Sequence, residues 1–273
     1  MANVTTTTIA VTIATLISKE IFLELENKPH MANLVFRRNA PRGVGTIKFP
    51  QIAKLTAVDK TSGTALTPAS NTETALTLLL DKHKAVAMEI DDIAELQSSL
   101  ELRKIYVSRM AEALATVLDT DLFALYSALS KTIGTGTASI TDANIREAIQ
   151  YLDEANAPAE RYLVIPPSQK NAILGIDKFV LAYESGDSTL KTGEIGQIYG
   201  VKVIVSNNCP VVTTTVKCLM FARDAFGLGV QQNIRVKSAW NVLGVAEDIV
   251  ADMVYGVCEL RDDFAVVIDC LIN

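Results

Sequence analysis

Residues 91–133 read DDIAELQSSLELRKIYVSRMAEALATVLDTDLFALYSALSKTI and contain neither glycine nor proline. Asp92 and Glu95 form a capping-box pattern at the start of this stretch. Apolar side chains recur along it at helical spacing, namely Ile93, Leu96, Leu100, Val107, Met110, Leu114, Val117, Leu118, Leu122, Leu125 and Leu129. The stretch therefore predicts one long helix that forms the backbone of a domain. Because the stripe is wide, we expect a sheet to cover it, with a coiled-coil partner as the alternative.

The segment before this helix, from Val35 to Ile90, has the pattern of strands and turns. Gly43, Gly45 and Pro50 punctuate a first strand, and Thr61-Ser62-Gly63 marks a reversal. Alternating residues predict a long, partly exposed return strand, namely Thr74, Leu76, Leu78 and Leu80 followed by Lys82, Lys84, Val86 and Met88. A hairpin with so few aromatic residues, and with a tip rich in Gly, Ser, Thr and Pro, is not expected to be stable alone. We expect the hairpin to pack either against the rest of its own subunit or against a neighbouring subunit.

The N-terminal region predicts an extended arm followed by a short helix. Residues up to about Ser18 are rich in threonine and β-branched side chains and have no amphipathic period. Ile17, Ile21 and Leu25 then recur at helical spacing, and Pro29 ends the helix. No basic cluster precedes the first apolar stretch, so a secretory signal is not expected, and no segment has the length of a membrane span.

The C-terminal half mixes helices and strands without a regular βαβ repeat, which indicates an α+β fold. Thr141 is expected to begin a second helix that Pro158 closes. The elements expected after it are a buried strand (162–165), a helix begun by proline (167–174), two strands (201–206 and 216–222) and a terminal hairpin (254–260 with 264–268).

The composition limits the classes of function. The net charge of −6 argues against tight, sequence-independent binding of nucleic acid, although it does not exclude enclosing a genome. Only two histidines are present, and the four cysteines form no C-x-x-C pair, so no metal site is expected. Buried free thiols are the better interpretation, which implies folding in a reducing cytosol. The four are Cys209, Cys218, Cys258 and Cys270.

No motif predicts catalysis, and we expect no catalytic residue, cofactor or metal. The glycine clusters at 43–45 and 134–136 lack the complete phosphate-loop patterns. The signatures S-x-x-K and K-T-G overlap on one lysine, Lys191, which indicates coincidence. Asp91-Asp92 is expected to cap a helix, and Asp262-Asp263 to lie in a hairpin turn. An enzyme with an unrecognised pocket in the α/β part is a second, weaker alternative.

The distribution of charge suggests an assembly contact. Residues 37–60 carry six basic side chains and one acid, whereas residues 89–121 carry eight acids and three bases. Opposite charges of this kind set the register and the rate of association between subunits. The hypothesis is that the hairpin lies over the helix of the next subunit; a solvated basic strand is the alternative. The candidate contacts are Arg37, Arg38, Arg42, Lys48, Lys54, Lys60, Glu95, Glu101 and Glu112.

The order of elements resembles the major capsid protein of tailed double-stranded DNA bacteriophages, with the Hong Kong 97-type fold. Residues 17–21, 32–35 and 44–50 are similar to the family's arm and the start of its E-loop. Residues 81–92 (DKHKAVAMEIDD) are similar to the return of that loop into the spine helix. Residues 162–167 (YLVIPP) and 219–228 (LMFARDAFGL) are similar to strands of the axial domain.

This resemblance implies a shell of hexamers and pentamers that forms an icosahedral virion around double-stranded DNA, assembled in the host cytoplasm. It implies separate scaffolding and portal proteins as partners, a decoration protein in some members, DNA held without sequence-specific contacts, and no membrane. Lys48, Lys54 and Lys60 supply amines for the cross-link that some members form. An encapsulin compartment with the same fold is the alternative. The implied divisions are an arm with a short helix (1–35), an E-loop hairpin (36–90), a peripheral domain with the spine helix (91–135), an axial domain (136–235) and returning peripheral strands (236–273).

Overall fold

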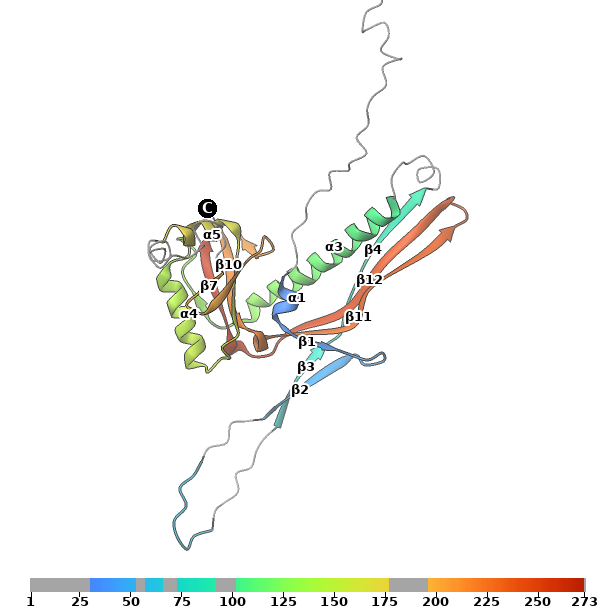
Figure 1. The fold of residues 1–273 in the computed structure, drawn as a ribbon. Coiled ribbons are helices and arrows are strands. Elements are labelled where there is room, and N and C mark those ends of the chain that lie inside the picture. Colours follow the sequence, from blue (N-terminus) through green and yellow to red (C-terminus); the bar gives the residue numbers. More distant parts are fainter. Residues whose placement is uncertain (1–29, 53–56, 66–72, 92–101, 177–195, 273) are drawn as a thin grey trace, which may run out of the picture.

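The computed structural model describes residues 30–52, 57–65, 73–91, 102–176 and 196–272. The chain forms an α/β lobe, an elongated sheet with a long helix beside it, and a hairpin that projects from their junction (Figure 1). The N-terminal arm, the short helix expected before Pro29 and the polar loop containing Lys191 lie outside the described residues.

The helices and strands run in the following order. They are α1 (Met31–Leu34), β1 (Phe36–Asn39), β2 (Thr46–Ile52), β3 (Glu73–Leu79), β4 (Lys82–Asp91), α3 (Leu102–Phe123), η1 (Ala124–Ala128), β5 (Thr132–Ile133), α4 (Asp142–Glu154), β6 (Arg161–Ile165), α5 (Pro167–Leu174), β7 (Gln197–Ile198), β8 (Val201–Val205), β9 (Val211–Val212), β10 (Thr215–Ala222), η3 (Arg223–Ala225), β11 (Phe226–Asn241), β12 (Ala246–Glu259), η4 (Asp262–Phe264) and β13 (Ala265–Leu271).

The elongated sheet has four strands in the order β1-β11-β12-β4. β1 runs parallel to β11, and the other neighbours are antiparallel. The helix α3 lies along this sheet and contacts β12 and β4 most (Figure 1). Met110, Leu114 and Leu122 of α3 are buried, which confirms that a sheet covers the apolar stripe.

The α/β lobe is built on a mixed seven-stranded sheet. Six strands follow the order β5-β13-β10-β6-β8-β7, and β9 pairs with β10. The helix α4 begins where the sequence predicts, because the Thr141 side chain accepts a hydrogen bond from the Asn144 N–H, and its Ile145, Ala148 and Leu152 are buried. β6 and α5 also lie at their predicted positions. One cluster of buried side chains continues from this sheet into the elongated one, so the two lobes share a core.

The β2–β3 hairpin is seated on a pair of glycines. Gly229 of β11 and Gly256 of β12 are register partners in the elongated sheet. A Cβ at Gly229 would lie 2.7 Å from Leu78 Cδ2 and 2.9 Å from Ile47 Cδ1, and a Cβ at Gly256 would lie 1.8 Å from the Leu79 carbonyl oxygen. Ile47 and Leu78 are buried in a small separate core at this position. The missing side chains thus create the space that holds the base of the hairpin.

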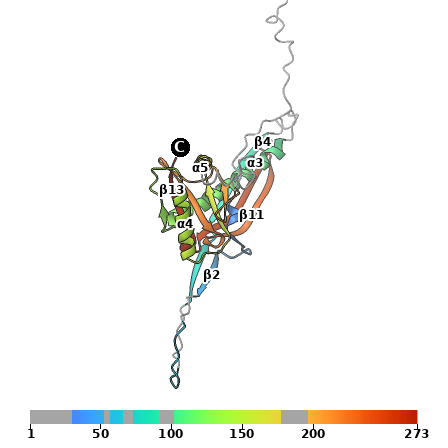
Figure 2. The ribbon, with the colours of Figure 1, turned by 60° about the vertical axis from the view of Figure 1, so that its left-hand side comes forward.

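Beyond this seat, the hairpin projects away from the rest of the subunit in both views (Figures 1 and 2). Residues 57–65 at its tip are all exposed, and Val58 is 75% exposed. The turn at residues 61–64 confirms the predicted reversal, with a hydrogen bond from the Thr64 N–H to the Thr61 carbonyl oxygen. The described part of the hairpin therefore buries side chains only at its base.

Three expectations for single elements are wrong. The long helix ends at Phe123 rather than near residue 133, because the chain passes through a 3-10 turn into the short strand β5. The return strand is divided at Leu80 and Asp81: β3 pairs with β2, but β4 pairs with β12. The expected terminal hairpin does not form, since β12 and β13 belong to different sheets.

The two carboxylate pairs also differ from expectation. Asp91 is the last residue of β4 and pairs in register with Ala246, instead of capping a helix; Asp92 lies outside the described residues. Asp262 lies in a 3-10 turn rather than in a hairpin turn, and it accepts hydrogen bonds from the Ser130 N–H at 2.8 Å and from the Ser130 hydroxyl. Asp262 therefore fixes the chain where it leaves the helical region.

The glycine seat predicts a specific loss of stability. We expect Gly256→Ala to destabilise the folded chain by about 2 kcal/mol or more, because the new Cβ meets backbone that can move only if the hairpin shifts. Gly45→Ala is the matched control, since no atom lies within 4 Å of a Cβ at Gly45. Urea unfolding curves measure the difference. Equal midpoints for the two variants would show that the hairpin is not held at this position.

Candidate functional site

A buried carboxylate on α3 joins three parts of the chain. Asp119 Oδ1 accepts a hydrogen bond from the Met31 N–H at 2.8 Å, and Oδ2 accepts one from the His30 N–H at 3.1 Å. The Asn208 side-chain amide donates to the same Oδ2 at 3.3 Å from the α/β lobe. Asp119 is fully buried. It therefore fixes where the N-terminal segment joins the body and how the α/β lobe meets the helix.

A second carboxylate of α3 connects the helix to the sheet. Asp121 Oδ2 accepts a hydrogen bond from the Tyr255 hydroxyl at 2.7 Å and lies 3.0 Å from Lys82 Nζ. Burial alone would raise the pKa of Asp121, but the hydrogen bonds from Tyr255 and Lys82 outweigh it, so the pKa lies below its usual value. Asp121 is therefore ionised, and its carboxylate contacts Tyr255 and Lys82 of its own subunit.

A third cluster crosses the elongated sheet. Arg235 of β11 makes two hydrogen bonds to Asp252 of β12, at 2.8 Å from Nε and 2.6 Å from Nη2. His83 Nε2 of β4 lies 3.2 Å from Asp252 Oδ2. The hydrogen bonds from Arg235, with a smaller effect of His83, lower the pKa of Asp252 to about 2. The cluster links three neighbouring strands.

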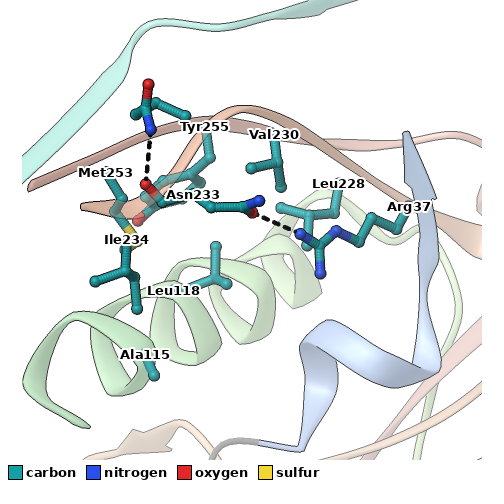
Figure 3. Close-up of a pocket in the computed structure, with 10 residues that line it drawn as sticks. Arg37, Ala115, Leu118, Leu228, Val230, Asn233, Ile234, Met253 and Tyr255 are labelled. Carbon is teal, nitrogen blue, oxygen red and sulfur yellow. Dashed lines mark hydrogen bonds between the residues drawn. The ribbon is translucent and has the colours of Figure 1, made fainter. Parts of the chain in front are cut away.

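A cavity of about 140 Å3 lies between α3 and the β11 strand (Figure 3). Leu118 and Ala115 line it from the helix, and Ile234 and Met253 line it from the sheet. At its rim, Arg37 of β1 donates a hydrogen bond to Asn233 Oδ1 at 2.7 Å. The lining is mainly apolar and holds no arrangement of a nucleophile and a base, so it offers a surface for packing.

The four thiols are free, as predicted. Burial, together with the charge of Asp119, raises the pKa of Cys209 to about 12, and burial with Glu259 raises that of Cys258 to about 11. These thiols therefore stay protonated at neutral pH. Within the described ranges, no group of three or more His, Cys, Asp or Glu side chains is placed to hold a metal ion. Among the helices described, none is both long enough and apolar enough to cross a membrane.

The predicted contact residues have different environments. Arg38, Arg42, Lys48 and Lys60 are exposed, and the described residues supply none of them with an ion-pair partner. Arg37 instead turns toward Asn233. Glu112 is exposed on α3 and pairs with Arg109 at 3.1 Å. Lys54, Glu95 and Glu101 lie outside the described residues.

The expected acidic surface of the helix is smaller than the charge count implied. Asp119 and Asp121 make contacts within the subunit, and Glu89 and Asp91 belong to β4 rather than to the helix. The burial of Asp119 was not predictable from its neighbours in sequence, because its partners at residues 30, 31 and 208 are remote along the chain. The glycine seat was missed for the same reason, since its two glycines come together only when β11 pairs with β12.

A comparison with known protein families shows to which family the chain belongs. The sequence profile of the phage capsid protein family matches residues 80–268, which is more than half of the chain. The chain belongs to the phage capsid protein family. The role of this capsid protein is accordingly structural, and the resemblance recognised in the sequence is confirmed.

Solved structures show which fold this capsid protein has. It is similar to a structure from Mycobacterium phage Che8 (23% identity over 94% of this chain and 96% of that chain, TM-score 0.79). It is also similar to the capsid of Cyanophage P-SCSP1u (18%, 97% and 95%, TM-score 0.81) and to the head of Helicobacter pylori bacteriophage KHP40 (12%, 96% and 97%, TM-score 0.78). The α+β, Hong Kong 97-like capsid fold is thus confirmed. No curated protein matches the chain.

The junction at Asp119 makes a stability prediction. Asp119→Ala should destabilise the capsid protein by about 3 kcal/mol, because it leaves buried N–H donors without an acceptor. Asp119→Asn retains an acceptor oxygen and should lose less. The neighbouring Thr120 is exposed, so Thr120→Ala serves as the control and should change the free energy of unfolding by about 0.5 kcal/mol or less. Urea denaturation measures all three; equal effects of Asp119→Ala and Thr120→Ala would contradict the anchoring role.

The strand-crossing cluster makes a prediction for acid stability. Folding lowers the pKa of Asp252 from 3.8 to about 2. The stabilisation that the ionised Asp252 gives the folded state is therefore complete above about pH 4 and is lost as the pH falls through 2. Asp252→Asn should therefore be less stable than the parent at pH 7, and this difference should shrink between pH 4 and pH 2. Denaturant titrations at several pH values follow it. A difference that stays constant over that range would contradict the ionic role of Asp252.

Proposed function

We propose that this capsid protein assembles into hexamers and pentamers that tile an icosahedral phage head around double-stranded DNA. The observation that carries the proposal is the projecting hairpin: its base is fixed on the glycine seat, whereas its described tip is wholly exposed. An extension of this kind buries little within its own subunit. Its stabilisation must come from a neighbour, so interfaces replace internal core.

We propose that the elongated sheet and the sheet of the α/β lobe form the two domains that the resemblance implies, peripheral and axial. The elongated sheet with α3 serves as the peripheral domain (91–135 and 236–273), and the α/β lobe serves as the axial domain (136–235) at capsomer centres. The sheet pairing departs from these bounds at several strands. β1 and β4, from region 36–90, and the start of β11, from region 136–235, pair in the elongated sheet, whereas β5 and β13, from the peripheral regions, pair in the sheet of the lobe. The arm (1–35) would contact other subunits in the shell.

In this proposal, the basic segment 37–60 lies over the spine helix of the next subunit. Its exposed cations, Arg38, Arg42, Lys48 and Lys60, lack partners among the described residues of their own chain. Arg37 and Lys54 belong to the same basic segment. Glu95, Glu101 and Glu112 are the carboxylates proposed for this contact, since Asp119 and Asp121 are used internally; Glu112 is exposed but would also keep or exchange its pairing with Arg109. Charge complementarity would then set the register of neighbouring subunits.

The remaining partners follow from the role of a container. The acidic net charge of −6 suits DNA held by enclosure rather than by sequence-specific contacts. Scaffolding and portal proteins would direct assembly in the host cytoplasm, and a decoration protein would bind the finished shell. No observation on the chain favours an encapsulin compartment over a phage head.

Charge reversal tests the hairpin contact. We expect the double variant Arg42→Glu with Lys48→Glu to reduce the yield of closed particles at least tenfold, because like charges then face each other across the interface. The subunit should stay folded, since both side chains are exposed. Sedimentation and electron microscopy measure assembly, and circular dichroism measures folding.

Two further variants make this test decisive. Arg42→Lys with Lys48→Arg preserves the charge and should assemble normally. Combining Arg42→Glu and Lys48→Glu with Glu101→Lys and Glu112→Lys in one chain should restore particles if the two surfaces meet, because every contact then again joins opposite charges. Normal shells from the reversed variant alone would disprove the contact.

A further inference from the structure

A lysine and an aspartate face each other on two neighbouring strands of the α/β lobe. Lys217 of β10 and Asp269 of β13 are register partners in the antiparallel pairing of these strands, which Figures 1 and 2 label. Side chains at directly opposite positions lie on the same face of the sheet. Lys217 Nζ lies 2.6 Å from Asp269 Oδ2. The amine is therefore one C–O bond away from the carboxyl carbon.

This pair is largely removed from water. Its two side chains are 15% and 16% exposed. The adjacent residues Cys218, Ile268 and Cys270 are fully buried. An ion pair in such a place carries a large desolvation cost. A proton transfer that leaves an amine and a carboxylic acid removes both charges and is easier here than in water.

A glycine turn closes over the carboxyl group of Asp269. Gly134 and Gly136 have positive φ angles of 85° and 68°. The Gly136 N–H donates a hydrogen bond to the main-chain carbonyl oxygen of Asp269 at 3.3 Å. A Cβ at Gly136 would lie only 3.3 Å from both Cγ and Oδ1 of Asp269. The backbone of the turn can thus approach the carboxyl group closely and shield it, because the residue has no side chain.

One oxygen of this carboxylate lacks a donor. Oδ1 of Asp269 is buried, and no donor in the described ranges of the chain is within hydrogen-bond distance of it. A buried carboxylate oxygen without a donor is costly, because it carries part of a negative charge. The carbonyl oxygen of an amide at the same place would belong to a neutral group. An amide therefore fits these surroundings better than the ion pair does.

We propose that Lys217 and Asp269 join in an isopeptide bond within each subunit. A proton first passes from Nζ to Oδ2, and the neutral amine then attacks Cγ. The Nζ–Cγ bond forms and the Cγ–Oδ2 bond breaks. Oδ2 leaves as water with two protons that come from Nζ, and Oδ1 remains as the amide carbonyl oxygen. The condensation needs no oxidant and no further reactant.

The bond would fasten the last strand of the lobe. β13 follows β12, so it is the strand by which the chain returns from the elongated sheet to the sheet of the lobe. A covalent link in the β10–β13 ladder would prevent β13 from separating from the lobe. Because the link joins two strands of one subunit, this inference goes beyond the proposed assembly and does not depend on it.

Mass spectrometry of the denatured, full-length chain tests the bond. We expect the intact mass to lie below that of the unmodified chain by one water molecule. A proteolytic digest should contain a product in which the peptides with residues 217 and 269 are joined. A chain of unmodified mass, or a digest in which both peptides are unlinked, would overturn the proposal.

Lys217→Arg is the matched control. A guanidinium can keep the ion pair with Asp269 but stays protonated, so it cannot act as the attacking amine. This variant should have its unmodified mass. A loss of water that persists in Lys217→Arg would place the modification elsewhere and contradict the proposal. The more exposed pair of Lys131 and Glu147, with Nζ and Oε1 3.7 Å apart, should remain unlinked in the same digest.

Discussion

The close packing of the hairpin base against Gly229 and Gly256 is the constraint on which the rest of the structure depends. Only a pair of residues without side chains lets Ile47, Leu78 and the Leu79 carbonyl approach the sheet this closely. The seat holds the base of the hairpin, and residues 57–65 at its tip are exposed. A capsid protein needs a rigid body and extensions that contact neighbouring subunits. The glycine seat is the point at which this hairpin is attached to the body.

The body is made rigid by carboxylates that work within the subunit. Asp119 joins the N-terminal segment, α3 and the α/β lobe, and Asp252 joins three strands of the elongated sheet. Because one apolar core continues through both lobes, these polar contacts orient parts that are already packed together. The projecting hairpin lies outside this core, and residues 57–65 at its tip are exposed. Stability and assembly thus depend on different sets of residues.

Local signals in the sequence predicted local structure well. The Thr141 cap, the proline that begins α5 and the buried strand β6 all act within a few residues, and each element lies where it was expected. Pairing between remote strands was not predictable in the same way. β12 and β13 follow each other in sequence, yet their partners come from β11 and β10, so the expected hairpin was wrong. The burial of Asp119 and the glycine seat likewise depend on contacts between distant residues. The overall assignment succeeded because the order of elements and several short motifs together resembled one family.

The most direct measurement of the central claim is hydrogen exchange across the hairpin in free subunits and in assembled shells. The account predicts that the amides of residues 57–65, which are exposed at the tip, exchange rapidly in the free subunit and become protected in the shell, because a neighbour covers them. Protection that is already complete in the free subunit, or exchange that stays equally fast after assembly, would contradict it.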